Sequence, residues 1–197
     1  MKQQEKRRIT KGNFTTALFK LCREKEFTRI SVKDICSCAG YHRSTFYEYY
    51  SDIYDLRDQT EDRLIASLTK IFTLSSTESL TAAFIHSFTR INEESGEILW
   101  YLLSENGDPH FAVKIKEALK PYYFKVFAIP PTDQDMEYVF DFAIMSGLSF
   151  YVSWYSKGKH FDADSAVALV RRVLVDGLAT VIAEHSEKPD QVSMKFI

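Results

Sequence analysis

Residues 31–50 constrain the fold more than any other part of the chain. Ser31 is a good N-cap, and Asp34, three residues later, completes a pattern that resembles a capping box. The inward face of a short helix follows, formed by Val32, Ile35, Cys36 and Ala39. Gly40 then favours a sharp end to that helix, because glycine tolerates the left-handed backbone such a turn needs. A second short helix is expected over 42–50, so the segment predicts a helix-turn-helix arrangement.

The rest of the chain also predicts helices. Only seven Gly and five Pro occur in 197 residues, and scarce chain breakers favour long helices. Apolar periodicity, with Thr10 as the N-cap of the first helix, places the other helices as follows: about 10–22, 53–72, 80–93, 98–103 ended by Asn106-Gly107, 109–125 with Pro109 in its first turn, 133–157 and 163–185. The alternating run 124–129 fits a short strand, but no partner strand exists, so we interpret it as a helix end and a loop.

The sequence therefore predicts an all-α protein with two domains. A three-helix helix-turn-helix domain spans 1–52, and a helical bundle spans 53–197, with the helix 53–72 as a bridge. The polar stretch 74–79 is the best candidate for a linker.

Charge is distributed unevenly between these two parts. The chain carries a net charge of −2, yet residues 1–50 hold 11 Lys and Arg against five Asp and Glu, a net charge of +6. The remainder therefore carries −8. A basic end on an acidic body is typical of a protein whose N-terminal part meets a polyanion, although a solvated basic terminus has the same composition.

The residues of the second short helix fit contact with DNA. At its N-terminal turn, Arg43 is able to bond the O6/N7 edge of guanine, Ser44 permits close approach, and Thr45 suits a phosphate or a thymine methyl. Tyr47 and Tyr49 lie on the outer side, where phenol hydroxyls commonly bond phosphates. The alternative is an ordinary amphipathic helix with surface tyrosines.

The stretch 10–56 resembles the DNA-binding domain of the TetR/AcrR family of bacterial transcriptional regulators. The matching residues are Thr10, Phe27, Ile30-Ser31-Val32-Lys33-Asp34-Ile35, Ala39-Gly40, Ser44-Thr45-Phe46-Tyr47-Glu48-Tyr49-Tyr50, Asp52 and Asp55-Leu56. The rest of the chain agrees in helix count, in length and in Gly147, Trp154 and Gly158.

The resemblance implies residue roles by position. Base-reading residues would be Arg43, Ser44 and Thr45, and residues at the DNA backbone would be Ser31, Lys33, His42, Tyr47 and Tyr49. Two positions depart from the family pattern: Glu26 stands where many members have Gly, and Ile53 stands where many have a phosphate-contacting Lys. The basic arm (Lys2, Lys6, Arg7, Arg8 and Lys11) is a candidate replacement for that contact, with a disordered, solvated tail as the alternative.

The two last helices predict a homodimer, because the first of them is apolar nearly all round and one small protein cannot easily cover both. The expected interface residues are Gly147, Tyr151, Val170, Leu174, Gly177 and Val181. The resemblance also implies a small-molecule effector pocket in the aromatic-rich bundle. Its candidate lining is Phe84, Phe88, Trp100, Tyr101, Tyr123, Met145 and Tyr151, with a well-filled core as the alternative.

Other function classes find little support. The chain has no Gly-rich phosphate loop, no H-E-x-x-H and no G-x-S-x-G, so we expect neither an enzyme nor a cofactor. Cys36 and Cys38 are two residues apart, which points them to different sides of a helix, and no Cys–His set completes a metal site. Cys22 and Cys36 are expected in the core, with redox sensing as the alternative. We expect no membrane contact and no signal peptide, and hence a cytoplasmic regulator of double-stranded operator DNA. A regulator, such as an activator, controlled by a protein partner and a bundle-cavity enzyme or carrier without DNA binding stay open as alternatives.

Overall fold

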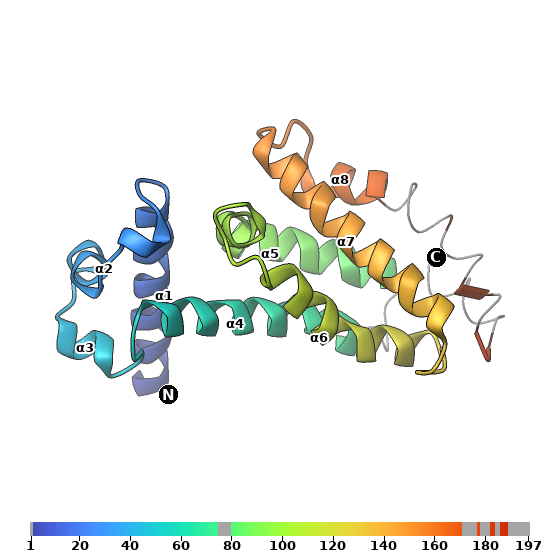
Figure 1. The fold of residues 1–197 in the computed structure, drawn as a ribbon, viewed down its shortest axis with the longest axis horizontal. Coiled ribbons are helices and arrows are strands. Elements are labelled where there is room, and N and C mark those ends of the chain that lie inside the picture. The colour runs from blue at the N-terminus through green and yellow to red at the C-terminus, as the bar shows by residue number, and fades with distance from the viewer. Residues whose placement is uncertain (1, 75–79, 171–176, 178–181, 184–185, 189–197) are drawn as a thin grey trace. The chain divides into compact units, whose positions relative to one another are not determined.

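The computed structural model of the chain describes residues 2–74, 80–170, 177, 182–183 and 186–188, with the backbone alone for residue 2, 71–74 and 80–88. Within these residues it contains eight α-helices, one 3-10 turn and no strand, which confirms the predicted all-α class (Figure 1). The chain forms two compact units, Met1–Arg63 and Leu64–Ile197. The division falls inside the helix α4 (Ile53–Leu74) rather than at its start, so the first half of α4 belongs to the N-terminal unit.

The N-terminal unit packs three helices and the start of α4 around an aromatic core. It consists of α1 (Lys2–Cys22), the 3-10 turn η1 (Phe27–Arg29), α2 (Val32–Ala39), α3 (Arg43–Tyr47) and the first turns of α4. Phe14 of α1 meets Phe46 of α3 edge-to-face, with ring centroids 5.3 Å apart, and both side chains are fully buried. Aromatic pairs in this arrangement stabilise a core beyond the area they bury.

The local signals around α2 are confirmed. The Ser31 hydroxyl accepts a hydrogen bond from the Asp34 backbone N–H at 3.2 Å, and the Asp34 carboxylate accepts one from the Ser31 N–H at 2.9 Å. Gly40 ends the helix with φ +74°, in the left-handed region. The helix α3 is shorter than expected, since it ends at Tyr47 and the chain then turns to bury Tyr50.

The start of α1 was predicted wrongly. The helix begins at Lys2, so Thr10 lies inside it and its hydroxyl donates to the Lys6 carbonyl, 2.9 Å away. Residues 3–9 are exposed and carry no apolar periodicity, so the pattern held no signal for this segment. Lys, Gln, Glu and Arg are nevertheless good helix formers, and Glu5 pairs with Arg8 one turn later.

The second unit is a bundle in which α5 packs against α6, α7 and α8. Its helices are α5 (Leu80–Leu103), α6 (Phe111–Val126), α7 (Gln134–Ser156) and α8 (Ala163–Val170). The two helices expected over 80–93 and 98–103 are one helix, α5. Gly96 does not interrupt it, because a glycine costs a helix only about 1 kcal/mol and the Tyr151 hydroxyl donates to the Gly96 carbonyl at 2.9 Å.

The ends of α6 and α7 follow local chemistry. Pro109 precedes α6 instead of lying in its first turn, and α6 runs on to Val126, so the run 124–129 is a helix end and a turn as interpreted. Asp133 caps α7 by accepting the Met136 backbone N–H at 3.0 Å. Within the described helices, none is long and apolar enough to cross a membrane.

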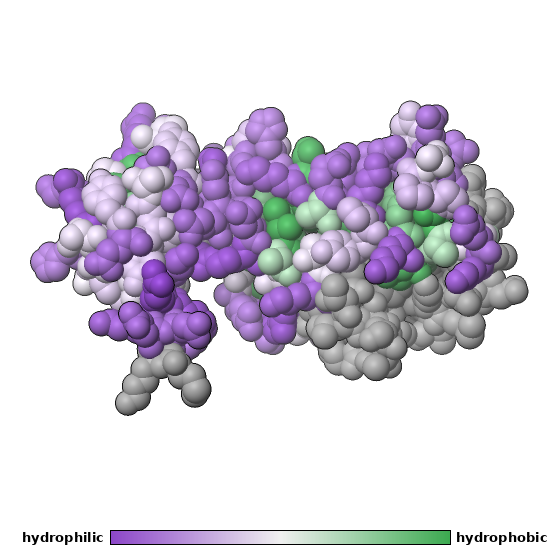
Figure 2. Space-filling view, turned by 90° about the horizontal axis from the view of Figure 1, so that it is seen from below, coloured by the Kyte–Doolittle hydropathy of each residue, from purple (hydrophilic) through white to green (hydrophobic). Residues whose placement is uncertain are grey.

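The expected complete burial of α7 is not met within one chain. Tyr138, Phe142 and Met145 follow one another at i, i+4 and i+7 and are 76%, 62% and 42% exposed. On the face of the bundle drawn in Figure 2, green apolar residues interrupt the purple hydrophilic surface. The residues 171–176 and 178–181 of the expected last helix, including Leu174 and Val181 of the expected interface, lie outside the described part of the chain.

Candidate nucleic-acid interface

The short helix α3 presents a polar outer side to solvent. Arg43 and Ser44 are exposed in its first turn, next to the exposed N-cap His42, and Tyr47 is 57% exposed one turn later. Within the described residues, the Arg43 guanidinium makes no hydrogen bond or ion pair, so its donors are available. Thr45 is half-buried, which leaves it less accessible than its two neighbours. The helix thus offers one bidentate donor group and two hydroxyls on a single face.

The start of α2 lies in a small ionic network. Lys33 is exposed, whereas the Ser31 hydroxyl is engaged, since it donates to the Asp34 carboxylate at 2.8 Å. The Lys25 amine, 2.9 Å away, and the Ser31 backbone hold the pKa of the Asp34 carboxyl well below its usual range. The two expected backbone contacts on α2 therefore differ: the amine of Lys33 is accessible, and the hydroxyl of Ser31 already serves as the helix cap.

A second network fixes the end of α3, and sequence reasoning missed it. The Gln59 side chain of α4 donates to the Tyr49 carbonyl at 3.2 Å and to the Asp55 carboxylate at 2.9 Å, and it accepts from the Lys11 amine at 2.9 Å. The Gln59 amide and the Ser51 backbone N–H hold the pKa of Asp55 below its usual range. This side chain thereby joins α1, α4 and the chain that follows α3, three segments whose proximity no local pattern reveals.

The tyrosines after α3 divide between surface and core. Tyr49 is half-buried, with the guanidinium carbon of Arg7 5.7 Å from its ring centroid, so its ring packs against α1 as well as facing outward. Tyr50 is 2% exposed, and burial raises the pKa of its hydroxyl to about 12. Of the tyrosines in this segment, Tyr47 is therefore the most accessible for a DNA backbone.

The N-terminus of α4 is already occupied by protein groups. The Asp52 carboxylate accepts the backbone N–H groups of Tyr54 and Asp55 at 2.8 and 2.9 Å. Ile53, one of the two positions that depart from the resemblance, is buried. A carboxylate on two of the first amides of α4 competes with a phosphate and would repel one, so this end of α4 is a poor phosphate site.

The cysteines are spread over different environments. Cys36 is buried, Cys38 is exposed and Cys22 is half-buried. Burial raises the pKa of the Cys36 thiol, which lowers its thiolate fraction and hence its reactivity. Cys36 is therefore a core residue, as expected, whereas Cys22, also expected in the core, is only partly buried.

The candidate effector residues are not brought together in one place. Trp100 donates to the Ser156 hydroxyl at 2.8 Å and stacks on Tyr155, whereas Tyr123 packs on Phe140, with ring centroids 4.9 Å apart. Ser156 and Phe140 are about 24 Å apart along α7, at the helical rise of about 1.5 Å per residue. Tyr101 and Tyr151 are buried, and Met145 is at the surface. The side chains of Phe84 and Phe88 lie outside the described residues.

The expected interface residues are also in different environments. A Cβ atom built on Gly147 would meet nothing within 4 Å, so α7 has open space there in the single chain. Val170 is half-buried and Gly177 is exposed. Tyr151 is buried within its own chain, where its hydroxyl bonds the Gly96 carbonyl, so it is not at the surface of the single chain.

The fold of the chain resembles that of a solved structure. No protein-family model and no curated protein matches the chain. Among solved structures, it is similar to the crystal structure of a TetR-family transcriptional regulator from Streptomyces coelicolor, with a TM-score of 0.60 and 16% sequence identity. The similarity covers 94% of this chain and 90% of that chain. A structural similarity at this sequence identity supports the fold alone. The chain therefore has the all-α fold of a TetR-family transcriptional regulator.

Proposed function

We propose that the chain is a DNA-binding transcriptional regulator, in which α2 and α3 form the helix-turn-helix and α3 enters the major groove. The observation that carries this proposal is the outer side of α3, where exposed Arg43 and Ser44 stand beside Tyr47 on a helix fixed by a fully buried Phe46. Arg43 would read guanine, Ser44 and Thr45 would contact the groove, and Lys33, His42 and Tyr47 would hold the backbone. Tyr49 and Ser31 would add to these contacts where their packing permits.

We further propose a homodimer through α7 and the C-terminal residues. The apolar stripe Tyr138, Phe142 and Met145 supports an interface on α7, because exposed aromatic residues at helical spacing are typical of a surface that a partner covers. The twofold axis would present two α3 helices to successive major grooves and read a pseudo-palindromic operator. Val170, Leu174, Gly177 and Val181 complete the proposed interface.

A small-molecule effector would control this dimer by population shift. The ligand would bind more tightly to the conformation of the bundle in which the two α3 helices have the wrong spacing for DNA. DNA affinity would then fall by the ratio of the ligand's affinities for the two conformations. Such a regulator is a repressor that its effector releases from DNA. Polar groups for such a ligand exist in the bundle core: the Asn92 side-chain oxygen is buried without a hydrogen-bond partner among the described residues. It lies next to Gly96, whose carbonyl the Tyr151 hydroxyl bonds.

The test is the effect of Arg43→Ala on binding to a duplex selected by the protein and to random-sequence DNA. Loss of a bidentate guanine contact should weaken binding to the selected duplex by about 1–3 kcal/mol and relax base preference at one position. Random DNA should lose less, because base contacts add little there. Lys20→Ala, which removes one exposed charge in the last turn of α1, is the control. Equal losses on both duplexes would show that Arg43 does not read bases.

A further inference from the structure

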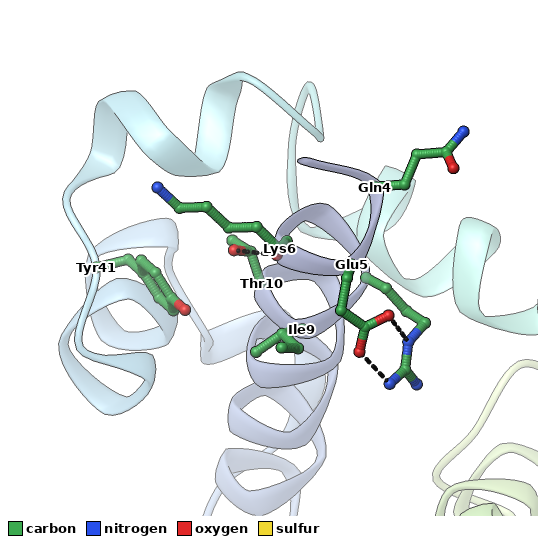
Figure 3. A pocket seen from close by; sticks show the side chains of 7 residues that line it. Gln4, Glu5, Lys6, Ile9, Thr10 and Tyr41 are labelled. Atoms are coloured by element: carbon green, nitrogen blue, oxygen red, sulfur yellow. Dashed lines mark hydrogen bonds and ion pairs between the residues drawn. The ribbon is translucent and has the colours of Figure 1, made fainter. Parts of the chain in front are cut away.

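A groove lies beside the helix-turn-helix. It has a volume of about 760 Å³ and lies between the first turns of α1 and Tyr41, the residue between Gly40 and the N-cap of α3 (Figure 3). The side chains of Ile9 and Tyr41 face one another across it, and Lys6 and Thr10 lie on the same stretch of α1. Because Tyr41 is two residues from Arg43, the groove borders the turn of α3 that carries the proposed base reader.

The groove holds a hydroxyl donor in a fixed position. The Asn13 amide donates to the Tyr41 hydroxyl oxygen at 3.0 Å, and the Tyr41 ring packs on Phe14, with centroids 5.0 Å apart. The hydroxyl oxygen is thus used as an acceptor, and no acceptor for its own proton is found within the described residues. The phenol is therefore anchored by its ring and its oxygen and can still donate one hydrogen bond.

The charges of the groove favour an anion. The Glu5 carboxylate is neutralised within α1 by two hydrogen bonds from Arg8, at 3.1 and 2.7 Å. The Lys6 amine, in contrast, has no hydrogen-bond or ion-pair partner in the described part of the chain, and the groove keeps a positive charge. Ile9 adds an apolar wall, since half of its surface is exposed.

We propose that this groove, on the proposed DNA-binding unit, holds the sugar-phosphate backbone of one DNA strand beside the base pairs that α3 reads. In this arrangement Tyr41 donates its hydroxyl proton to a phosphate oxygen, Lys6 neutralises the phosphate charge, and Ile9 contacts the deoxyribose. The contact takes the place of one at the N-terminus of α4, where the Asp52 carboxylate occupies the amides of Tyr54 and Asp55. The first two turns of α1, which bury nothing in the core of their unit, thereby gain a function.

The experiment measures binding of the full chain to a random-sequence duplex between about 50 and 200 mM salt, where affinity depends on phosphate contacts. Lys6→Gln should lower the slope of log affinity against log salt by about one per protomer. Lys20→Gln removes the same charge from the same helix, about 21 Å farther along, and should leave the slope unchanged. Lys6→Arg should keep the wild-type slope.

Tyr41→Phe provides a second, independent measurement. It keeps the ring on Phe14 and removes the donor, so random-duplex affinity should fall about tenfold with little change in the salt slope. Tyr122→Phe removes the hydroxyl of an exposed tyrosine on α6, is the control and should bind as the wild type does.

The outcomes separate this inference from the proposed function. If the wild-type chain binds the duplex and Lys6→Gln behaves as Lys20→Gln does, the groove does not hold DNA, and the regulator proposal stands. If the wild-type chain fails to bind the duplex even at low salt, the proposed function fails, and the groove proposal fails with it.

Discussion

In the N-terminal unit the exposed residues of α3 carry hydrogen-bonding groups, and the Arg43 guanidinium has no hydrogen-bond or ion-pair partner among the described residues. In the bundle, α7 exposes an apolar stripe, Tyr138, Phe142 and Met145, between its polar surface residues. Both units nevertheless build their interiors in the same way, from tilted and edge-to-face aromatic pairs such as Phe14–Phe46 and Phe124–Phe140. The two units therefore differ in the chemistry of their exposed residues. The surface of α3 suits a polyanion, because it offers hydrogen-bond donors, and the stripe on α7 suits a second apolar surface.

The largest expected effect is the loss of stability when an aromatic ring is removed from the core rather than from the surface. Phe46→Ala removes a fully buried ring and should destabilise the N-terminal unit by about 3–5 kcal/mol, because it removes buried apolar surface and leaves a cavity in the core. Phe142→Ala removes an equally large ring from the exposed stripe of α7 and should change the stability of the single chain by less than about 0.5 kcal/mol. Urea unfolding at low protein concentration measures both. A similar loss in the two variants would mean that Phe142 is packed within its own chain.

The next effect concerns the surface of the bundle. Phe142→Glu fits the single chain, since this side chain is 62% exposed, but it would bury a charge in the proposed dimer. Sedimentation should show monomers, and circular dichroism should show unchanged helix content. Tyr122→Glu places the same side chain at an exposed aromatic position of α6 and should leave the dimer intact. A dimeric Phe142→Glu protein would place the interface elsewhere.

A smaller effect sharpens the local rules of the helix-turn-helix. Ser31→Ala removes the cap of α2 and should cost about 1 kcal/mol of stability, as measured by urea unfolding.

The pKa of Asp34 is lowered in the folded chain. The contribution of Asp34 to stability is therefore present above the pKa of a free Asp and is lost as pH falls through the folded value. Urea titrations on descending pH should therefore show a smaller acid loss in Asp34→Asn than in the wild type. An unchanged acid profile would show that the network around Asp34 does not stabilise the fold.

The smallest effect lies in the alkaline range. The Tyr50 hydroxyl is buried without a hydrogen-bond partner among the described residues, and its pKa is raised to about 12. Since an unfolded tyrosine titrates near pH 10, this contribution to stability is complete below that pH and is lost as pH rises toward 12. Tyr50→Phe should weaken this alkaline loss and change stability at neutral pH by less than about 1 kcal/mol, as measured by unfolding at several pH values. A steeper alkaline loss in the variant would contradict the burial of this hydroxyl.

The parts of the structure that the sequence predicted are those that local chemistry decides. The capping box at Ser31 and Asp34 and the left-handed Gly40 each depend on neighbours within a few residues, and both were predicted from spacing alone. The start of α1 was missed, because residues 3–9 are exposed and bear no apolar pattern. The continuity of α5 was missed, because the contact of Tyr151 with Gly96 joins residues 55 positions apart.

The candidate site divides in the same way. The exposure of Arg43, Ser44 and Tyr47 follows from helical periodicity around Phe46, which the sequence contains. The Gln59 network and the groove at Tyr41 depend on how α1 and α4 pack against the ends of α3. No local pattern in the sequence reveals these contacts between distant segments. The sequence does contain one signal for Tyr41. A large aromatic residue directly after the helix-ending Gly40 is expected to pack against a neighbouring element, and Tyr41 packs on Phe14.

The most direct test of the central claim is a selection of duplexes from a random library by the wild-type chain. Two α3 helices related by a twofold axis predict a pseudo-palindrome whose half-site centres are about 10 bp, or a multiple of that, apart. Arg43→Ala in the same selection should lose the preference at one guanine in each half-site. Enrichment of no motif, or of a motif that Arg43→Ala leaves unchanged, would contradict the assignment of α3 as the helix that reads DNA.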